Sequence, residues 1–372
     1  MRNRWHPKAS RSVLTTSLLT SLVGVLAGSL LFCSSCSKQD DGKAASSQAQ
    51  TIRIGWQVAW ATQGQIAMAL QKTNALELMG LKGDFKSFTY GAPLSEAALA
   101  GQLDVAFVGD QPAVSLLART KDWCIAARLM DFRVAIVVPT DSPIKTVADL
   151  KGKTLGIPFG ASTHRVALEM LKEAGLEPGK DVNLINIDIT EQADVVKAGG
   201  GKAWPKVDAF ASWDHHIALY EKQGLARILN SGTALGVVMM SRNFAQKRPD
   251  EAARFLAAYK LAYYFYATHQ EETDKWFAEA AGGKFDLAIL KTVADVEPNT
   301  KARTIGDIKV DIGEKEISIL QDANDFALKQ QLIKSGSAIK DTIVSAPELS
   351  GEQMVRTNPS LVQKLQALVG TK

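Results

Sequence analysis

The chain is poor in the residues that build disulfides and metal sites. Of its 372 residues only three are cysteine and five are histidine. Cys33 and Cys36 lie together near the N-terminus, so Cys124 stands alone in the rest of the chain and an internal disulfide is excluded there. Cys124 has no Cys-x-x-Cys companion, and the histidines show no metal-ligand spacing, so we expect no bound metal.

The sequence also lacks the motifs of the common hydrolases. Neither Gly-x-Ser-x-Gly nor His-Glu-x-x-His occurs, and no Cys/His pair has a catalytic context. We therefore expect neither an enzyme nor a cofactor.

An excess of positive charge is lacking too, although the formal net charge is +4. The first 35 residues contain four basic and no acidic side chains, and 43 Lys and Arg less these four leaves 39 against 39 Asp and Glu. A chain without a basic face or a Lys/Arg run is not expected to bind nucleic acid.

The N-terminus has the layout of a bacterial export signal. A basic start is followed by an uncharged stretch of apolar and small residues at 13–32. Ser34 and Ser35 supply the small residues that lipoprotein processing needs before Cys36, so we predict an export signal at 1–36 that ends at a lipidated Cys36. The polar segment 37–50 is then a flexible tether.

Two alternatives to the lipid anchor stay open. Cleavage near Ala44 and Ala45 would release a soluble periplasmic protein. An uncleaved membrane helix is less favoured, because the apolar core is barely about 20 residues long and is broken by Gly24 and Gly28.

Apolar runs alternate with helical patterns through the middle of the chain, which predicts α/β structure with parallel strands. About 320 folded residues exceed the usual size of one core, so two lobes are expected. Crossings near Val138–Pro139 and Gly236–Met240 place lobe I at 51–137 plus 239–372 and lobe II at 138–238. The predicted strands are 52–55, 85–90, 105–108, 154–157, 182–187 and 207–210.

The last third carries helical patterns without a functional motif. After Pro249, aromatic and aliphatic residues from Phe255 to Tyr266 recur at the spacing of a core-facing helix. Further helices are predicted around 315–332, 351–356 and 360–368, packed on lobe I.

One segment has a distinctive order of elements. An apolar strand ends at Pro139, Thr146 and Asp149 can cap a short helix, and Thr154 to Ile157 forms the next strand. Its sequence "SPIKTVADLKGKTLGI" followed by "GASTHR" resembles the hinge and second-lobe entry of periplasmic solute-binding proteins, in particular the sulfonate, taurine and nitrate type of ABC importer.

Two more segments agree in order and separation, "GAPLSEAALAGQLDVAFVGDQP" at 91–112 and "VDAFASWD" at 207–214. The resemblance spans residues 52–280. It implies a two-lobed periplasmic-binding-protein clamshell of type II with a helical C-terminal extension.

Ligands of parallel α/β lobes bind beyond the carboxyl ends of the strands, which directs attention to the loops there. Three such loops lead into helices, whose free N–H groups and dipoles would together hold an oxyanion without a buried arginine. The candidate ligand-binding residues in these loops are Gln57, Trp60, Thr62, Gln63, Gly109, Asp110, Gln111, Ser162, Thr163 and His164.

The resemblance adds roles to some of these residues. Ser162, Thr163 and His164 match the anion-contacting loop of the second lobe, and Trp213 with Asp214 match an aromatic–acid pair. Asp110 matches an acid of the first lobe, which would suit the amine of a zwitterion such as taurine.

Gly91, from the matching segment, and Arg133, before the hinge, complete the candidates. Ser162, Thr163 and Asp110 could instead be ordinary caps of their own segments. Arg165 is expected to point outward, and His215–His216 to lie at a solvated helix start.

We therefore predict a substrate-binding lipoprotein that captures a small organic anion, with an alkanesulfonate or taurine as the first choice, and delivers it to an inner-membrane ABC permease. The predicted protein is a monomer at the periplasmic face of the membrane. Nitrate, bicarbonate, carboxylates or a thiamine-precursor pyrimidine are alternative ligands. A thiamine-pyrimidine-synthase-like enzyme and an exported sensor subunit are less favoured alternatives.

Overall fold

The computed structural model describes residues 50–283 and 286–368. The predicted export signal, its Cys36 and all but the last residue of the predicted tether lie outside the described residues. The described part belongs to one compact unit. Within it, no helix combines the length and apolar character needed to cross a membrane.

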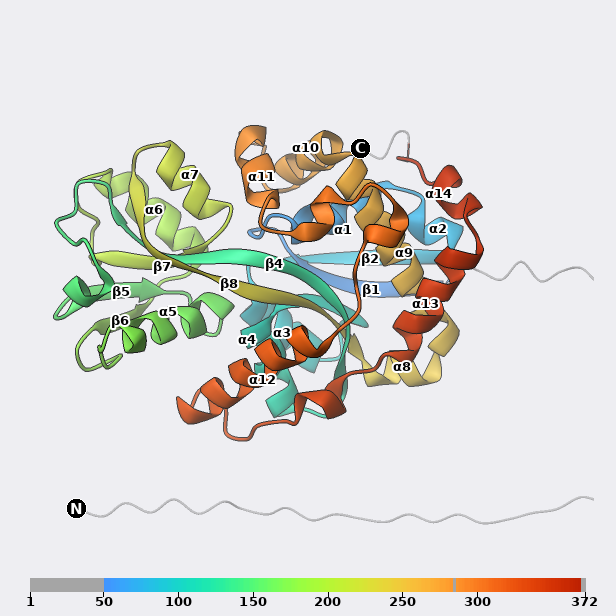
Figure 1. Ribbon diagram of the computed structural model, residues 1–372, viewed down its shortest axis with the longest axis horizontal. Coiled ribbons are helices and arrows are strands. Elements are labelled where there is room, and N and C mark those ends of the chain that lie inside the picture. The colour runs from blue at the N-terminus through green and yellow to red at the C-terminus, as the bar shows by residue number, and fades with distance from the viewer. Residues whose placement is uncertain (1–49, 284–285, 369–372) are drawn as a thin grey trace, which may run out of the picture. The chain divides into compact units, whose positions relative to one another are not determined.

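The unit is organised around one eight-stranded sheet in the order β2-β1-β3-β8-β4-β7-β5-β6 (Figure 1). The strands at either end of the sheet pair in parallel, as their alternation with helices predicts. The first set is β1 Gln50–Gln57, β2 Leu81–Phe88 and β3 Val105–Gly109, and the second is β5 Thr154–Ile157, β6 Asn183–Asn186 and β7 Ala209–Trp213.

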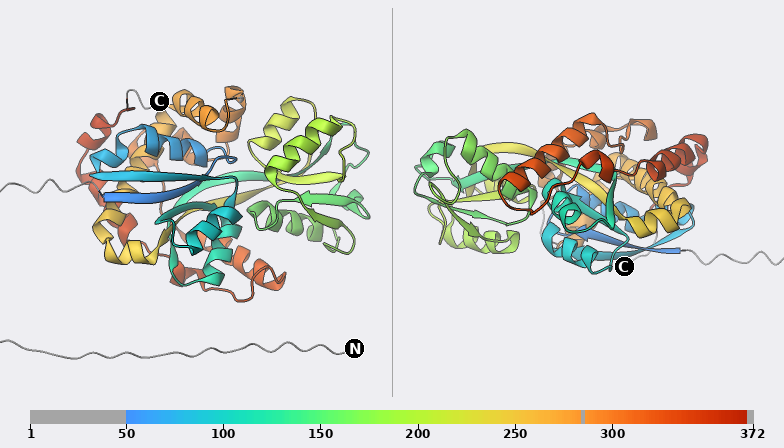
Figure 2. Two further views of the ribbon diagram at one scale, coloured as in Figure 1. Left: turned by 180° about the vertical axis from the view of Figure 1, so that it is seen from behind. Right: turned by 90° about the horizontal axis from the view of Figure 1, so that it is seen from below.

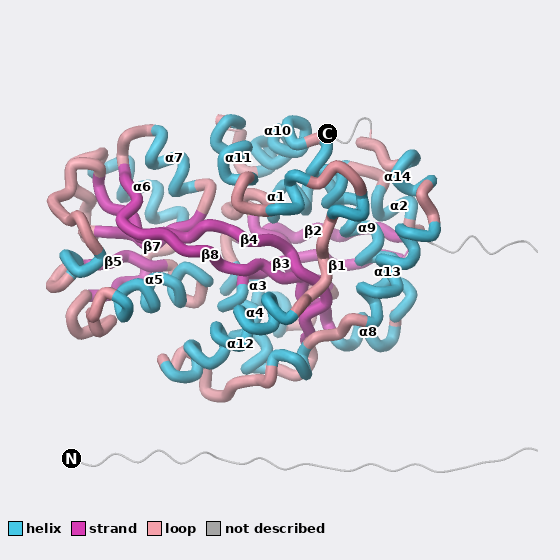
Figure 3. The backbone as a smooth tube through the Cα atoms, in the orientation of Figure 1, coloured by secondary structure: helices cyan, strands magenta, loops and turns pink. Residues whose placement is uncertain are grey.

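Two long antiparallel strands join the sets, β4 Trp123–Pro139 and β8 Ala226–Ser241 (Figure 3). Gly236–Met240 of β8 pairs with β3, whereas Val134–Val137 of β4 pairs with β7. Both strands run through both halves of the sheet without a break. The lobe boundaries at 137/138 and 238/239 therefore remain a prediction.

Helices cover both faces of the sheet (Figures 1 and 2). Those of the first half are α1 Gln63–Lys72, α2 Ala75–Leu78, α3 Gly91–Leu99 and α4 Asp110–Arg119. Those of the second half are α5 Ser162–Glu173, α6 Ile189–Gly199 and α7 His216–Lys222.

The turn that carries the resemblance has the predicted form. A 3₁₀ helix at Val147–Leu150 begins after Thr146, whose N–H donates to the Asp149 carboxylate at 2.8 Å. Gly152 follows with a positive φ of 74°. These contacts direct the chain from β4 into β5.

The C-terminal part consists of helices against the first half of the sheet. They are α8 Arg242–Lys247, α9 Pro249–Thr268, α10 Gln270–Ala280, α11 Leu287–Ala294, α12 Glu314–Lys329, α13 Ala346–Thr357 and α14 Ser360–Lys364. Short 3₁₀ turns at Pro298–Lys301, Ile305–Asp307 and Ile339–Thr342 connect them. The aromatic helix α9 is a core element as predicted, since Tyr259, Tyr263 and Tyr266 are fully buried.

A buried ion pair fixes this extension to the middle of β4. Arg128 donates to both carboxylate oxygens of Glu297, at 2.9 and 2.8 Å. The same carboxylate accepts from the N–H groups of Asp131 and Asn299. Arg128 also pairs with Asp131 at 3.2 Å, so the guanidinium and the two carboxylates form a buried charged cluster between the extension and β4.

Candidate functional site

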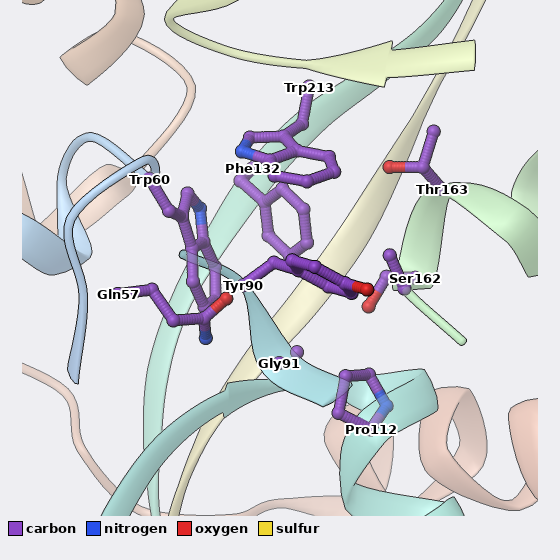
Figure 4. A pocket seen from close by; sticks show the side chains of 11 residues that line it. Gln57, Trp60, Tyr90, Gly91, Pro112, Phe132, Ser162, Thr163 and Trp213 are labelled. Atoms are coloured by element: carbon purple, nitrogen blue, oxygen red, sulfur yellow. The ribbon is translucent and has the colours of Figure 1, made fainter. Parts of the chain in front are cut away.

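A small cavity lies where loops of the first half of the sheet meet loops of the second half. It has a volume of about 20 Å³, which is room for the centre of roughly one water molecule. Figure 4 shows most of its lining. The lining residues are Gln57, Trp60, Tyr90, Gly91, Gly109, Pro112, Phe132, Ala161, Ser162, Thr163 and Trp213.

Aromatic rings form one side of the cavity. The rings of Trp60 and Phe132 pack at 4.6 Å between centroids. The Trp213 indole N–H donates to the carbonyl of Ala59 at 2.8 Å, which joins the second half of the sheet to the loop after β1. Tyr90 extends its ring toward Ser162 (Figure 4). These rings offer an apolar wall to an organic group.

Hydrogen-bond donors form the other side. The helices α3, α4 and α5 all begin at the cavity, and the first N–H groups of a helix have no partner within it. The Thr163 hydroxyl is buried without a hydrogen-bond partner among the described residues, and it points from α5 toward the aromatic wall (Figure 4). Donors and helix dipoles of this kind attract an anion.

Gly109 and Ser162 show how closely α4 and α5 approach each other. A Cβ at Gly109 would collide with the Ser162 hydroxyl oxygen. That oxygen also accepts a long hydrogen bond from the N–H of Gln111, at 3.4 Å. The two helix starts are thus in contact across the halves of the sheet.

None of the described residues that line the cavity is charged, and the charged residues nearby pair with each other. Asp110 is 0% exposed and its carboxylate accepts from Arg165 at 2.6 Å. Arg133 donates twice to Asp214, each time at 2.8 Å. Burial raises the pKa of Asp214, against the Arg133 hydrogen bonds that lower it.

Seven of the fourteen predicted ligand-binding residues line the cavity: Gln57, Trp60, Gly91, Gly109, Ser162, Thr163 and Trp213. The structure therefore brings together one residue or more from each of the three loops singled out in the sequence. Gln57 lies with its amide nitrogen donating to the carbonyl of Phe107 at 2.8 Å.

Two predicted residues at the start of α1 do not line the cavity. The Gln63 side chain bonds both the N–H and the carbonyl of Gln57, at 2.9 Å each. Thr62 is the N-cap, and its N–H donates to the Gln65 side chain. These polar groups are used in local contacts. The third helix that begins at the cavity, besides α4 and α5, is therefore α3 and not the predicted α1.

The other five predicted residues lie behind the lining. Asp110, Arg133 and Asp214 are held by the ion pairs described above. The Gln111 side chain donates to Ser115 at 3.1 Å. His164 stacks on Phe159 with ring centroids 4.7 Å apart, and burial lowers its pKa to about 4.

Two expectations about neighbouring residues are wrong. Arg165 does not point outward but is 6% exposed, because Asp110 and Glu169 both pair with it. His215 does not lie in solvent but is 1% exposed and stacks on His216 at 4.3 Å.

Four lining residues were not predicted: Tyr90, Pro112, Phe132 and Ala161. Tyr90 follows the carboxyl end of β2, so the rule used for the other loops would have found it. Phe132 precedes the predicted Arg133. Side chains alternate along a strand, so only one of these two can face the cavity, and it is the phenylalanine.

Comparisons with known proteins show which proteins this chain resembles in sequence and fold. Residues 74–197 match the family described as "ABC transporter, phosphonate, periplasmic substrate-binding protein". A putative aliphatic sulfonates-binding protein of Escherichia coli (strain K12) is 26% identical over 320 residues, which cover 84% of this chain and 94% of the relative.

Solved structures show the same fold. The alkanesulfonate-binding protein SsuA from Xanthomonas axonopodis pv. citri, bound to MOPS, aligns with a TM-score of 0.66 and 22% identity, over 80% of this chain and 99% of SsuA. The desulfurization enzyme DSZB aligns with a TM-score of 0.60 and 17% identity, over 82% of this chain and 99% of the enzyme. The predicted two-lobed clamshell is thereby confirmed.

Proposed function

We propose that the cavity captures a small organic sulfonate, on the premise that this chain belongs to the periplasmic solute-binding proteins of ABC importers. That family is the one predicted from the segment 142–165. Its members take up a small ligand and pass it to a membrane permease. The proposal concerns which ligand this chain takes and how it holds it.

The observation that carries the proposal is a neutral cavity with donors on one side and aromatic rings on the other. A sulfonate keeps its negative charge at every physiological pH and has three oxygens that accept hydrogen bonds. It therefore needs donors and no base. The unpartnered Thr163 hydroxyl and the starts of α3, α4 and α5 supply donors that become charge-assisted when the anion is bound.

The aromatic wall favours an organic ligand over a bare inorganic ion. Trp60, Phe132 and Trp213 would contact the carbon chain of an alkanesulfonate, and nitrate or bicarbonate has no such part. In the sequence Asp110 suited the amine of taurine, but its carboxylate is already paired with Arg165. We therefore propose a simple alkanesulfonate in preference to taurine.

A cavity of about 20 Å³ is too small for an alkanesulfonate to enter without movement. We propose that the two halves of the sheet, predicted as lobes 51–137 plus 239–372 and 138–238, open by hinge motion in β4 and β8. Ligand binding then favours the closed arrangement that the permease receives. Lipidation at Cys36, a location at the periplasmic face of the membrane and a monomeric state belong to the same proposal.

The fold shared with DSZB raises an enzyme as the alternative. A cysteine nucleophile would need a thiolate near the cavity. Burial raises the pKa of Cys124 to about 11, and its thiol lies 3.3 Å from the carbonyl of Met240 on β8, away from the lining. We infer a binding protein rather than an enzyme.

The test is a ligand panel followed by substitutions. Protein stripped of bound ligand is heated with ethanesulfonate, butanesulfonate, taurine, nitrate, bicarbonate and thiamine precursors, and a ligand that binds the native state raises the melting temperature. We expect the alkanesulfonates to give the largest shifts. Shifts from nitrate or bicarbonate alone, or none from any compound, would contradict the sulfonate assignment.

Two variants then locate the site. Thr163→Val removes one hydroxyl at nearly constant volume, and Trp213→Ala removes one wall. Thr163→Val should weaken alkanesulfonate binding at least about tenfold, since a hydrogen bond to a charged group contributes about 1.5–3 kcal/mol. Trp213→Ala should weaken it at least about tenfold as well, because the carbon chain loses an aromatic contact and the bond from Trp213 to the loop after β1 is lost. The control is Thr357→Val, because Thr357 is an exposed threonine on α13. Unchanged affinity in both test variants would remove this cavity as the binding site.

A further inference from the structure

A second cavity, here called the C-terminal cavity, lies away from the proposed sulfonate site. It is bounded by α9, α13, α14 and the segment 303–306. Its volume of about 490 Å³ falls in the range of pockets that hold small organic ligands, roughly 300–1,000 Å³. No pattern in the sequence predicts this cavity.

A buried lysine is the main polar feature of this cavity. Lys260 of α9 is 4% exposed, although lysine is almost never buried unless it is paired. Its ammonium group bonds one partner, the carboxylate of Glu352, whose side chain is 38% exposed. An ammonium has three protons to donate, so two of them have no acceptor among the described residues.

Two arginines add to the positive charge at the rim. Arg303 and Arg356 line the cavity with exposed side chains. Neither guanidinium makes an ion pair or hydrogen bond with a residue that the structure describes. Among the lining residues, these two and Lys260 give three positive charges against the one carboxylate of Glu352, and the buried carboxyl of Glu348 also lies within electrostatic range of Lys260. The cavity is thus matched to a negative group.

The remaining wall is largely apolar. It consists of Tyr264, Ile305, Val355, Pro359 and Val362. The Lys260–Glu352 pair can be explained by its structural role, because it holds α9 against α13. That role does not explain the two unpaired arginines around an apolar space. A ligand with both an anionic head and an apolar body would use all three features.

We propose that the C-terminal cavity binds an anionic amphiphile, a carboxylate or phosphate head group on an aliphatic body. The head group lies against Lys260, Arg303 and Arg356, and the aliphatic part lies against the apolar wall. A free fatty-acid-like molecule and an anionic lipid both have this chemistry. The site is independent of the sulfonate cavity and of its ligand.

The test is calorimetric titration of the whole protein with octanoate, below its micelle concentration. A parallel arm measures co-sedimentation with phosphatidylcholine vesicles with and without phosphatidylglycerol. We expect saturable binding with one equivalent of octanoate, and a vesicle signal only if lipid is the source. The absence of both octanoate binding and phosphatidylglycerol-dependent sedimentation would overturn the proposal.

Substitutions assign the binding to this cavity. Lys260→Met keeps the length of the side chain and removes the ammonium, and it should weaken binding at least tenfold. Arg356→Gln changes only an exposed residue at the rim, so this variant can be tested even if Lys260→Met does not fold. It should weaken octanoate binding at least threefold. Lys329→Met, at an exposed lysine on α12, is the matched control.

Thr163→Val separates this proposal from the sulfonate site. It should leave octanoate binding unchanged while it weakens alkanesulfonate binding. Wild-type octanoate affinity in both Lys260→Met and Arg356→Gln would place the octanoate elsewhere and overturn the proposal. Loss of octanoate binding in Thr163→Val would do the same, by placing it in the sulfonate cavity.

Discussion

The ion pair between Asp110 and Arg165 should control both folding and ligand binding. Asp110 is the first residue of α4 in the first half of the sheet, and Arg165 lies on α5 in the second half. The pair is buried directly behind Gly109 and Ser162, which line the sulfonate cavity. Replacing Arg165 by methionine keeps the volume of the side chain but leaves the Asp110 carboxylate without its counter-charge.

The stability that Arg165→Met should lose follows from the burial of the ion pair. Removing one partner of a buried pair costs about 3–5 kcal/mol, most of it the penalty of an isolated charge. The N–H groups of Gln111 and Leu235 still donate to Asp110, at 2.6 and 3.3 Å, and they reduce the cost toward the lower end. The double variant Asp110→Asn with Arg165→Met removes both charges of the buried pair, but Glu169 still lacks the two hydrogen bonds that Arg165 donates to it, so the double variant should recover part of the lost stability.

The pair crosses between the halves of the sheet, so part of the cost should appear as weaker binding. An uncompensated carboxylate behind the cavity would repel a sulfonate, and we expect Arg165→Met to raise the Kd for ethanesulfonate at least tenfold. The double variant should bind better than the single one. Urea unfolding and calorimetric titration of the four proteins of this cycle measure both effects.

The control is a second pair between the halves that is exposed to solvent. Lys222 of α7 pairs with Asp286 beside α11, and their side chains are 51% and 46% exposed. Such pairs contribute little, so Lys222→Met should change neither stability nor affinity measurably. The reasoning would be refuted if Arg165→Met were as stable as wild type, or if the double variant were no better than the single variant in either measurement.

Other substitutions test the surroundings of the site. Glu297→Gln should lower the free energy of unfolding by about 3 kcal/mol, the low end of the range for a broken buried pair, because Arg128 loses its bidentate partner but still pairs with Asp131 at 3.2 Å; a urea midpoint unchanged from wild type would contradict this. Burial lowers the pKa of His216 to about 4 in the folded protein, against about 6.5 in the unfolded chain. Below pH 6.5 the unfolded chain therefore binds a proton that the folded protein does not, and the free energy of unfolding decreases as the pH falls toward 4. This amounts to about 2 kcal/mol at pH 5, and His216→Asn should flatten the decline in urea midpoint between pH 8 and 5. Gly109→Ala should fold normally but weaken ethanesulfonate binding in calorimetry, because the new Cβ displaces the Ser162 hydroxyl, and it should have a smaller effect in a Ser162→Ala background.

The sequence was sufficient for those parts of the fold and site that depend on local patterns. Alternating strands and helices give the two parallel sets, and the cap at Thr146 gives the turn into β5. The loops after β3 and β5 could be identified because the carboxyl ends of parallel strands face a common edge. Gly109, Ser162 and Thr163 were found in this way.

The sequence was insufficient where a side chain had several possible partners. Gln63 was predicted to face a ligand, but its amide matches the backbone of Gln57 six residues earlier. Asp110 and Arg165 are 55 residues apart, and no local pattern shows that they meet. The long strands β4 and β8 were underestimated because polar and glycine residues interrupt their apolar runs at 131–133 and 230–233.

The buried pair and the neutral cavity explain each other. A sulfonate has no proton to give and needs none, so a site for it gains nothing from a free carboxylate and loses affinity to the repulsion. Asp110 is nevertheless placed beside two helix starts, where it accepts hydrogen bonds from the backbone of Gln111 and Leu235. Arg165 offsets the charge of Asp110 while it also pairs with the partly exposed Glu169, and its bond to Asp110 joins the halves of the sheet. The buried carboxylate nearest the helix starts is therefore paired, and the ligand does not have to make the contact that joins the two halves.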